Sequence, residues 1–82
     1  MANAIGFNTV DSFMAPDTAL ANLEQRVRGE LGNRVRHFQL MRDPTGLILK
    51  GRTQTYYAKQ MAQQVVMRTS SEPIAANEIE VS

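Results

Sequence analysis

A short apolar strand near the middle of the chain, Leu47-Ile48-Leu49-Lys50-Gly51, most strongly constrains how the chain can fold. Three apolar residues follow a turn sequence and stop at a glycine, a pattern that predicts a strand ending at Gly51. Segments with helical spacing lie before and after it. At 82 residues, with 43% of them hydrophobic, the chain has enough apolar material for one core. We therefore expect a single domain built around this strand.

Two segments have the spacing of amphipathic helices. The first begins at Asp17, whose carboxylate can accept a hydrogen bond from an unpaired first-turn amide, and ends at Gly32-Asn33. The second covers about residues 55–68 and begins at Thr55 as its cap. Each carries one apolar stripe, which we expect to face the core. The stripes are Leu20, Leu23, Val27 and Leu31 in the first helix and Ala58, Met61, Ala62 and Val65 in the second, with Tyr57 and Val66 beside the latter.

Residues 34–42 alternate in character and predict another strand. We assign Phe38 and Leu40 to the core. The same alternation puts Arg36 and Arg42 on the core-facing side, at the ends of the strand. The opposite side then carries His37, Gln39 and Met41.

Turn and breaker sequences connect these elements. Asp43-Pro44-Thr45-Gly46 predicts a turn, because proline presets one backbone dihedral and glycine accepts a positive φ. The two strands that it joins should form an antiparallel hairpin. After the second helix, Thr69-Ser70-Ser71-Glu72-Pro73 breaks the helix, and residues 74–81 predict a last strand. Its alternation places Ile79 and Val81 inward and Glu78 and Glu80 outward.

The expected fold is α+β, an αββαβ two-layer sandwich. Because a strand-helix-strand crossover is right-handed, both helices should lie on one face of a three-stranded mixed sheet. The other face is open to solvent or covered by an N-terminal arm, residues 1–16. Val10, Phe13 and Met14 in this arm have the spacing of one face of a short helix. The domain itself is expected to cover residues 17–82.

The composition of the chain argues against several classes of function. The chain has no cysteine, which excludes disulfides, thiolate metal sites and cysteine nucleophiles. His37 is the only histidine, and the nearby Gln39 and Asp43 do not complete a metal site or a catalytic triad. We therefore expect no catalytic residue, no metal and no cofactor. A net charge of +1 and the lack of a Gly-x-x-Gly loop between two helices argue against nucleic-acid binding of the KH type.

Sequence signals also bear on location. No apolar run approaches the roughly 20 residues that cross a bilayer. The first residues, Met-Ala-Asn-Ala-Ile-Gly-Phe-Asn, lack the basic and apolar regions of a secretory signal. The chain as written is therefore expected in the cytoplasm, and in the periplasm or cell envelope if a signal was trimmed from a precursor.

Four features recur together in one known family. They are the stripe Leu20-Leu23-Val27-Leu31, the strand end Leu47-x-Leu49-x-Gly51, the alanine-bearing helix that begins at Thr55, and the closing Asn77-Glu78-Ile79-Glu80-Val81. Over about residues 17–82 this set resembles the BON family, small αββαβ modules found mostly in bacterial envelope and stress proteins. The resemblance implies a non-catalytic module that binds phospholipid surfaces or mediates envelope assembly.

The sequence departs from the family pattern in two loops. Gly46 directly precedes Leu47, where the family usually has an extra residue, and Ser71-Glu72-Pro73 stands where it tends to have Gly-Val. Loops accept such changes without loss of the fold. Any ligand contact that the family makes through these loops is therefore not carried over to this chain.

Two surfaces are candidate binding sites. An anionic phospholipid surface would be bound by the basic residues in or beside the hairpin, each contributing about 1 kcal/mol. These residues are Arg34, Arg36, Arg42, Lys50 and Arg52. Strand alternation places the first three and the last two on different sides, so an alternative is that they are solvated edge charges. In the same interpretation Glu78 and Glu80 form cross-strand ion pairs with Lys50 and Arg52 and are not an acid–base pair.

A partner protein, such as another envelope protein or a second copy of the chain, would instead be bound by the open sheet face. The residues predicted to form this surface are His37, Gln39, Met41 and Ile48. Met41 and Ile48 are apolar residues predicted to point outward, which indicates that something covers them. Exposed edge strands also favour self-association.

Overall fold

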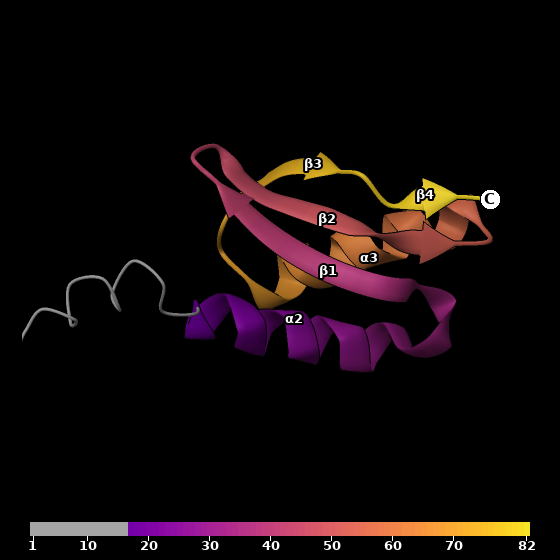
Figure 1. The fold of residues 1–82 in the computed structure, drawn as a ribbon, viewed down its shortest axis with the longest axis horizontal. Coiled ribbons are helices and arrows are strands. Elements are labelled where there is room, and N and C mark those ends of the chain that lie inside the picture. Colours follow the sequence, from indigo (N-terminus) through magenta and orange to yellow (C-terminus); the bar gives the residue numbers. More distant parts are fainter. Residues whose placement is uncertain (1–16) are drawn as a thin grey trace, which may run out of the picture.

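The computed structural model of the chain describes residues 17–82, so the arm predicted for residues 1–16 lies outside the described residues. Its elements follow the predicted αββαβ order, with the last strand divided in two (Figure 1). They are α2 (Thr18–Leu31), the 3-10 helix η1 (Gly32–Arg34), β1 (Arg36–Asp43), β2 (Gly46–Thr53), α3 (Tyr56–Thr69), β3 (Ile74–Asn77) and β4 (Glu80–Val81).

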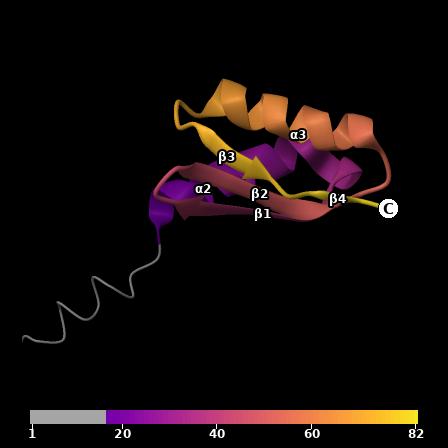
Figure 2. The same cartoon turned by 90° about the horizontal axis from the view of Figure 1, so that it is seen from above.

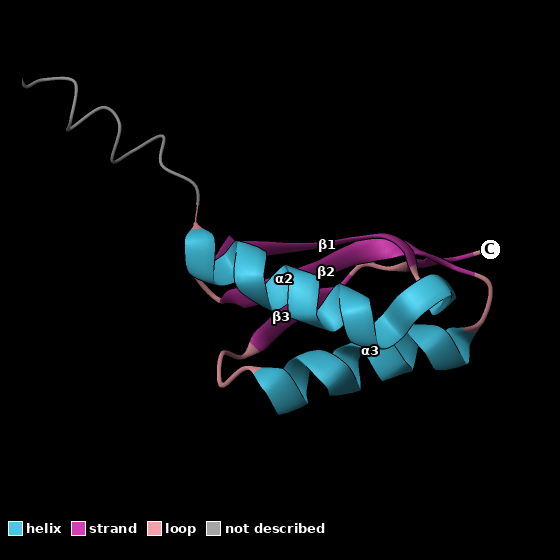
Figure 3. Ribbon diagram, turned by 90° about the horizontal axis from the view of Figure 1, so that it is seen from below, coloured by secondary structure: helices cyan, strands magenta, loops and turns pink. Residues whose placement is uncertain are grey.

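The sheet is mixed and open, with β2 at its centre. β1 pairs with β2 in antiparallel fashion, and both β3 and β4 pair with the other side of β2 in parallel. The two helices lie together on one face of the sheet (Figure 3). α3 lies beside β3 and β4, while α2 packs on β1 and α3 (Figure 2). The α+β class and the two-layer arrangement predicted from the sequence are confirmed.

The described sheet has four strands where three were predicted, because the chain bends between β3 and β4. Asn77 holds this bend: its side-chain oxygen accepts a hydrogen bond from the Ile79 amide at 3.2 Å. The side-chain nitrogen of Asn77 donates to the Lys59 carbonyl on α3 at 3.0 Å. Ile79 is thereby turned into the core, where it is 1% exposed.

Both helices begin at the predicted caps. The Asp17 carboxylate accepts from the Leu20 amide at 2.9 Å, and the Thr55 hydroxyl accepts from the Ala58 amide at 3.0 Å. α2 ends at Gly32, which has a φ of 58°, the left-handed conformation that glycine adopts at little cost.

The core lies between the helices and the inner face of the sheet, and it contains most of the predicted stripe residues. Its fully buried large side chains are Phe38, Leu31, Leu47, Leu49, Ile79, Val27 and Val66. Two residues that were predicted to point toward the core, Tyr57 and Val81, are exposed instead. Tyr57 is 72% exposed, because burial of Ala58 and Ala62 rotates α3 so that Tyr57 projects sideways. Val81 is also exposed, because β4 is a two-residue edge strand with a neighbour on one side only.

A β-bulge interrupts the β1–β2 ladder at His37. Arg36 is opposite Arg52, but the next pair is Gln39 with Lys50, so two residues of β1 face Gly51 alone. His37 has a φ of 55°, a left-handed conformation that is uncommon for residues other than glycine. The bulge moves Arg36 to the open side of the sheet, so the prediction that it shares the Phe38 face is wrong.

Gly51 does not end β2, as the sequence predicted, and the strand continues to Thr53. A Cβ at Gly51 would lie 2.9 Å from Val35 Cγ1 and 3.1 Å from the Arg36 carbonyl oxygen. The glycine is therefore required by the close approach of β1 at the bulge. It marks an irregular point within the strand, and not its end.

The outer edge of β1 is capped by side chains of α2. Glu24 accepts a hydrogen bond from the Leu40 amide at 2.9 Å, and Arg28 donates to the Phe38 carbonyl at 2.8 Å. Glu24 and Arg28 also form an ion pair at 3.1 Å. Two backbone groups that an edge strand normally leaves free are thus occupied.

Candidate functional site

The face of the sheet opposite the helices carries a row of apolar side chains. Met41 is opposite Ile48 in the β1–β2 ladder, and Ile48 is opposite Ala76 in the β2–β3 ladder. Met41 is 48% exposed, and Ile48 and Ala76 are half-buried. No helix or strand within residues 17–82 covers this row, which we call the apolar row. Alternation predicted two of its members, whereas Ala76 was not singled out.

Charged residues continue the same face toward the other end of the sheet. Lys50 and Glu78 form an ion pair at 3.3 Å, and Arg52 and Glu80 form one at 3.1 Å, as the alternation predicted. Beside them lies a shallow hollow above the bulge. It is lined by Arg36, His37, Gln39, Lys50, Gly51, Arg52, Glu78 and Glu80. Of the predicted protein-binding residues, Gln39, Met41 and Ile48 are therefore neighbours on this face, and His37 lies at its bulged end.

The five predicted anion-binding residues do not gather at one place. Arg42 lies at the hairpin end of the sheet, where it contacts Asp17 and forms two hydrogen bonds with Glu72, at 2.8 and 3.0 Å. These bonds hold the pKa of Glu72 below its usual value and raise that of Arg42. Lys50 and Arg52 have the glutamate partners described above. Three of the five cations are thus locally neutralised.

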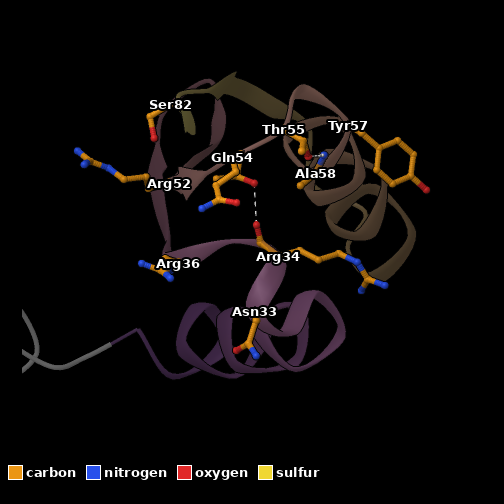
Figure 4. A pocket seen from close by; sticks show the side chains of 10 residues that line it. Asn33, Arg34, Arg36, Arg52, Gln54, Thr55, Tyr57, Ala58 and Ser82 are labelled. Atoms are coloured by element: carbon orange, nitrogen blue, oxygen red, sulfur yellow. Dashed lines mark hydrogen bonds between the residues drawn. The ribbon is translucent and has the colours of Figure 1, made fainter.

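The other two predicted cations, Arg34 and Arg36, line a cavity at the opposite end of the sheet (Figure 4). We call it the end cavity; its volume is about 350 Å³. It is lined by Asn33, Arg34, Arg36, Arg52, Thr53, Gln54, Thr55, Tyr57, Ala58 and Ser82. Thr53, which is 4% exposed, donates a hydrogen bond to the Arg34 carbonyl at 2.7 Å and ties two walls together. No local sequence signal predicts this cavity, because its walls come from three separate segments.

Residues 17–82 contain no group of three histidine, cysteine, aspartate or glutamate side chains placed to hold a metal ion. Within the same residues, neither helix has the length and apolar character needed to cross a membrane. Comparisons of the chain with protein-family models, curated proteins and solved structures found no match.

Proposed function

We propose that the chain is a non-catalytic binding module whose open sheet face docks a partner protein. The observation that carries this proposal is the apolar row of Met41, Ile48 and Ala76 on a face that no described element covers. The ion pairs of Lys50 and Arg52 flank the row. An apolar centre with a polar rim is the usual arrangement of a protein–protein interface.

The charge pattern of this face favours a protein partner over a phospholipid surface. Attraction to anionic lipids depends on cations that are not already neutralised. On the open face, Lys50 and Arg52 each lie within ion-pair distance of a glutamate, and Arg42 does so at the hairpin end, whereas Arg36 has no carboxylate partner among the described residues. A partner with a matching apolar patch and few net charges suits such a surface better. This corresponds to the assembly role, not the lipid role, that the resemblance to the BON family implies.

The surroundings of the only histidine support a role without catalysis. His37 lies in the shallow hollow above the bulge, whose other lining residues are arginine, lysine, glutamate, glutamine and glycine. No serine or threonine hydroxyl lines this hollow within residues 17–82, so the histidine has no nucleophile beside it to activate.

Aspartate substitutions in the apolar row test this proposal. We expect Met41→Asp and Ile48→Asp each to weaken binding of the partner by about 30-fold, because a carboxylate would be buried at the interface centre. Met67→Asp is the matched control, since Met67 is 56% exposed on α3, which lies on the opposite face. Partners are captured on the immobilised chain, and those retained by the Met67 variant but lost by the other two are purified and titrated by calorimetry.

Analytical ultracentrifugation of the chain alone shows whether the partner is a second copy. A dimer that dissociates in the Met41 and Ile48 variants would identify the partner as a second copy of the chain. Binding that is unchanged in both variants would refute the use of this face. The chain and both variants would instead support the lipid role if they floated equally with phosphatidylglycerol vesicles and if salt weakened this binding.

A further inference from the structure

The charged side chains around the shallow hollow of the open face are separated by sign. The cations lie on β1 and β2, whereas the carboxylates lie beyond β2, in β4 or directly before it. The cations are Arg36, Lys50 and Arg52, and the carboxylates are Glu78 and Glu80. This end of the open face is therefore positive toward β1 and negative toward β4.

These charges form two rows that cross the strands beside the apolar row. The nearer row contains the Lys50–Glu78 ion pair. The farther row contains Arg36, Arg52 and Glu80. The apolar row and the two charged rows follow one another along β2 at every second residue, so all three lie on the same face.

Arg36 is the one cation of the hollow that has no carboxylate partner within residues 17–82. It is directly opposite Arg52 in the β1–β2 ladder, and Figure 4 shows the two side chains on the same side of the domain. Like charges in such positions repel. Glu80 lies on the far side of Arg52 and pairs with it through one oxygen, Oε1, at 3.1 Å. The Glu80 side chain is still 69% exposed, so its other oxygen can accept from a second arginine.

A second copy of the chain would bring such a glutamate to Arg36 by packing face to face about a two-fold axis parallel to the strands. Rotation about this axis keeps each row at its place along the strands and exchanges the β1 side with the β4 side. The two apolar rows then stack, with Met41 of one copy over Ala76 of the other and Ile48 near the axis. Arg36 of each copy lies over Glu80 of the other.

The cations near this axis are compatible with the stacking. The Lys50–Glu78 pairs of the two copies would run in opposite directions, so that each lysine lies between two glutamates. An axis perpendicular to the strands does not offer Arg36 a partner. It would bring the charged rows over the hairpin end of the other copy, where Asp43 is on the same face. Arg36 lies twice as far along β2 from the apolar row as Asp43 does, so the two could not meet while the apolar rows are stacked.

We propose that the partner of the open face is a second copy of this chain, in a face-to-face dimer in which Arg36 of each copy pairs with Glu80 of the other. This inference rests on the proposed function, since both use the apolar row. A second copy supplies an apolar patch of matching size and a charge pattern of opposite order. Three apolar residues from each copy indicate a weak, reversible dimer.

Exchange of the two charges tests this dimer, with sedimentation equilibrium of the full chain as the measurement. We expect Arg36→Glu and Glu80→Arg each to weaken dimerisation by about tenfold or more, because each reversal acts at two symmetric contacts. An equimolar mixture of the two variants should dimerise within about threefold of the parent, since both contacts between unlike chains again join opposite charges. Glu80→Gln removes only the charge, and serves if Glu80→Arg detaches β4.

Glu30→Arg is the matched control for net charge. It makes the same change as Glu80→Arg but lies on α2, on the opposite face of the sheet. Alone it should dimerise as the parent does. Mixed with Arg36→Glu it should not restore dimerisation, because one of the two contacts still joins like charges. Equal restoration by both partners would overturn the proposal, because binding would then follow net charge.

The remaining outcomes separate this inference from the proposed function. A chain that stays monomeric at every concentration overturns the dimer. If that monomer still binds another protein, and Met41→Asp abolishes the binding, the proposed function stands with a different partner. If NMR of the monomer instead shows contacts between Met41 and residues 1–16, the arm covers the face. A dimer that Met41→Asp dissociates but the charge reversals leave unchanged would refute the Arg36–Glu80 contact and leave the proposed function intact.

Discussion

Replacing Glu24 with alanine removes the acceptor that caps the β1 edge. In the folded chain the Glu24 carboxylate accepts from the Leu40 amide at 2.9 Å and pairs with Arg28, which itself donates to the Phe38 carbonyl. After the substitution the Leu40 amide has no side-chain partner, and Arg28 loses the carboxylate that orients it. The variant should therefore be less stable than the parent.

The size of the effect follows from these contacts. A hydrogen bond to a charged group contributes roughly 1.5–3 kcal/mol, and an i,i+4 ion pair on a helix roughly 0.3–0.5 kcal/mol. The Glu24 side chain is 23% exposed, and water can reach a strand edge, so the lower half of the range applies. We expect Glu24→Ala to lower the free energy of unfolding by about 2 kcal/mol. Glu24→Gln should cost about 1 kcal/mol, because its amide oxygen can still accept from Leu40.

Urea unfolding followed by circular dichroism measures both values. Glu30→Ala is the control, because Glu30 lies on the same helix and pairs with Arg68 but has no hydrogen bond to a strand. Its loss should change stability by less than about 1 kcal/mol. A Glu24→Ala variant no less stable than Glu30→Ala would refute the edge-capping role.

Two further perturbations test other parts of the fold. Gly46→Ala should destabilise the domain by about 2–4 kcal/mol, because a Cβ there would lie 2.4 Å from the Pro73 carbonyl oxygen at a φ of 144°; thermal unfolding measures this. Lowering the pH should destabilise the chain, since hydrogen bonds from Arg42 lower the pKa of Glu72, and those from the turn lower the pKa of Asp43. Groups with a lowered folded pKa stabilise above their unfolded pKa, and this stability is lost as the pH falls through the folded pKa. Urea unfolding from about pH 7 to about pH 2 follows the loss, which Glu72→Gln should reduce.

Each of these results has a clear contrary outcome. A Gly46→Ala variant with the melting temperature of the parent would mean that the Pro73 loop moves aside at no cost. A Glu72→Gln variant whose stability falls with pH as steeply as that of the parent would mean that the Arg42 hydrogen bonds do not set the acid response.

Local signals were sufficient to predict the regular parts of the fold. Asp17 and Thr55 mark the helix starts because a side-chain cap acts within three residues of itself, and the proline–glycine turn between β1 and β2 is equally local. The side chains of Met41 and Ile48 were correctly predicted to point outward, since alternation holds wherever the ladder is regular.

The irregular parts depend on contacts between distant segments, which sequence periodicity does not report. The bulge at His37 exists because Gly51 allows β1 to approach closely, and alternation alone therefore placed Arg36 on the wrong side. The break after β3 depends on Asn77 reaching the Lys59 carbonyl on α3. Ala76 was overlooked because its side chain is too small to stand out in an alternating pattern.

The candidate sites were predictable to a similar extent. The ion pairs of Glu78 and Glu80 were predicted from strand parity together with the expectation that the last strand lies beside the second. The pairing of Arg42 with Glu72, 30 positions away in the chain, requires the hairpin and the α3–β3 loop to meet. For the same reason, five basic residues that appear as one cluster in the sequence lie at separate places in the fold.

The capped edge of β1 also limits how copies of this chain can join. Sheets that grow by adding strands continue indefinitely only when each copy offers two free edges. Because Glu24 and Arg28 occupy two backbone groups in the middle of the β1 edge, strand pairing between the described parts of two copies is favoured at the β3 side. Such pairing joins two copies and then has no further edge to use. Residues 17–82 therefore favour a closed pair over an open-ended row of sheets.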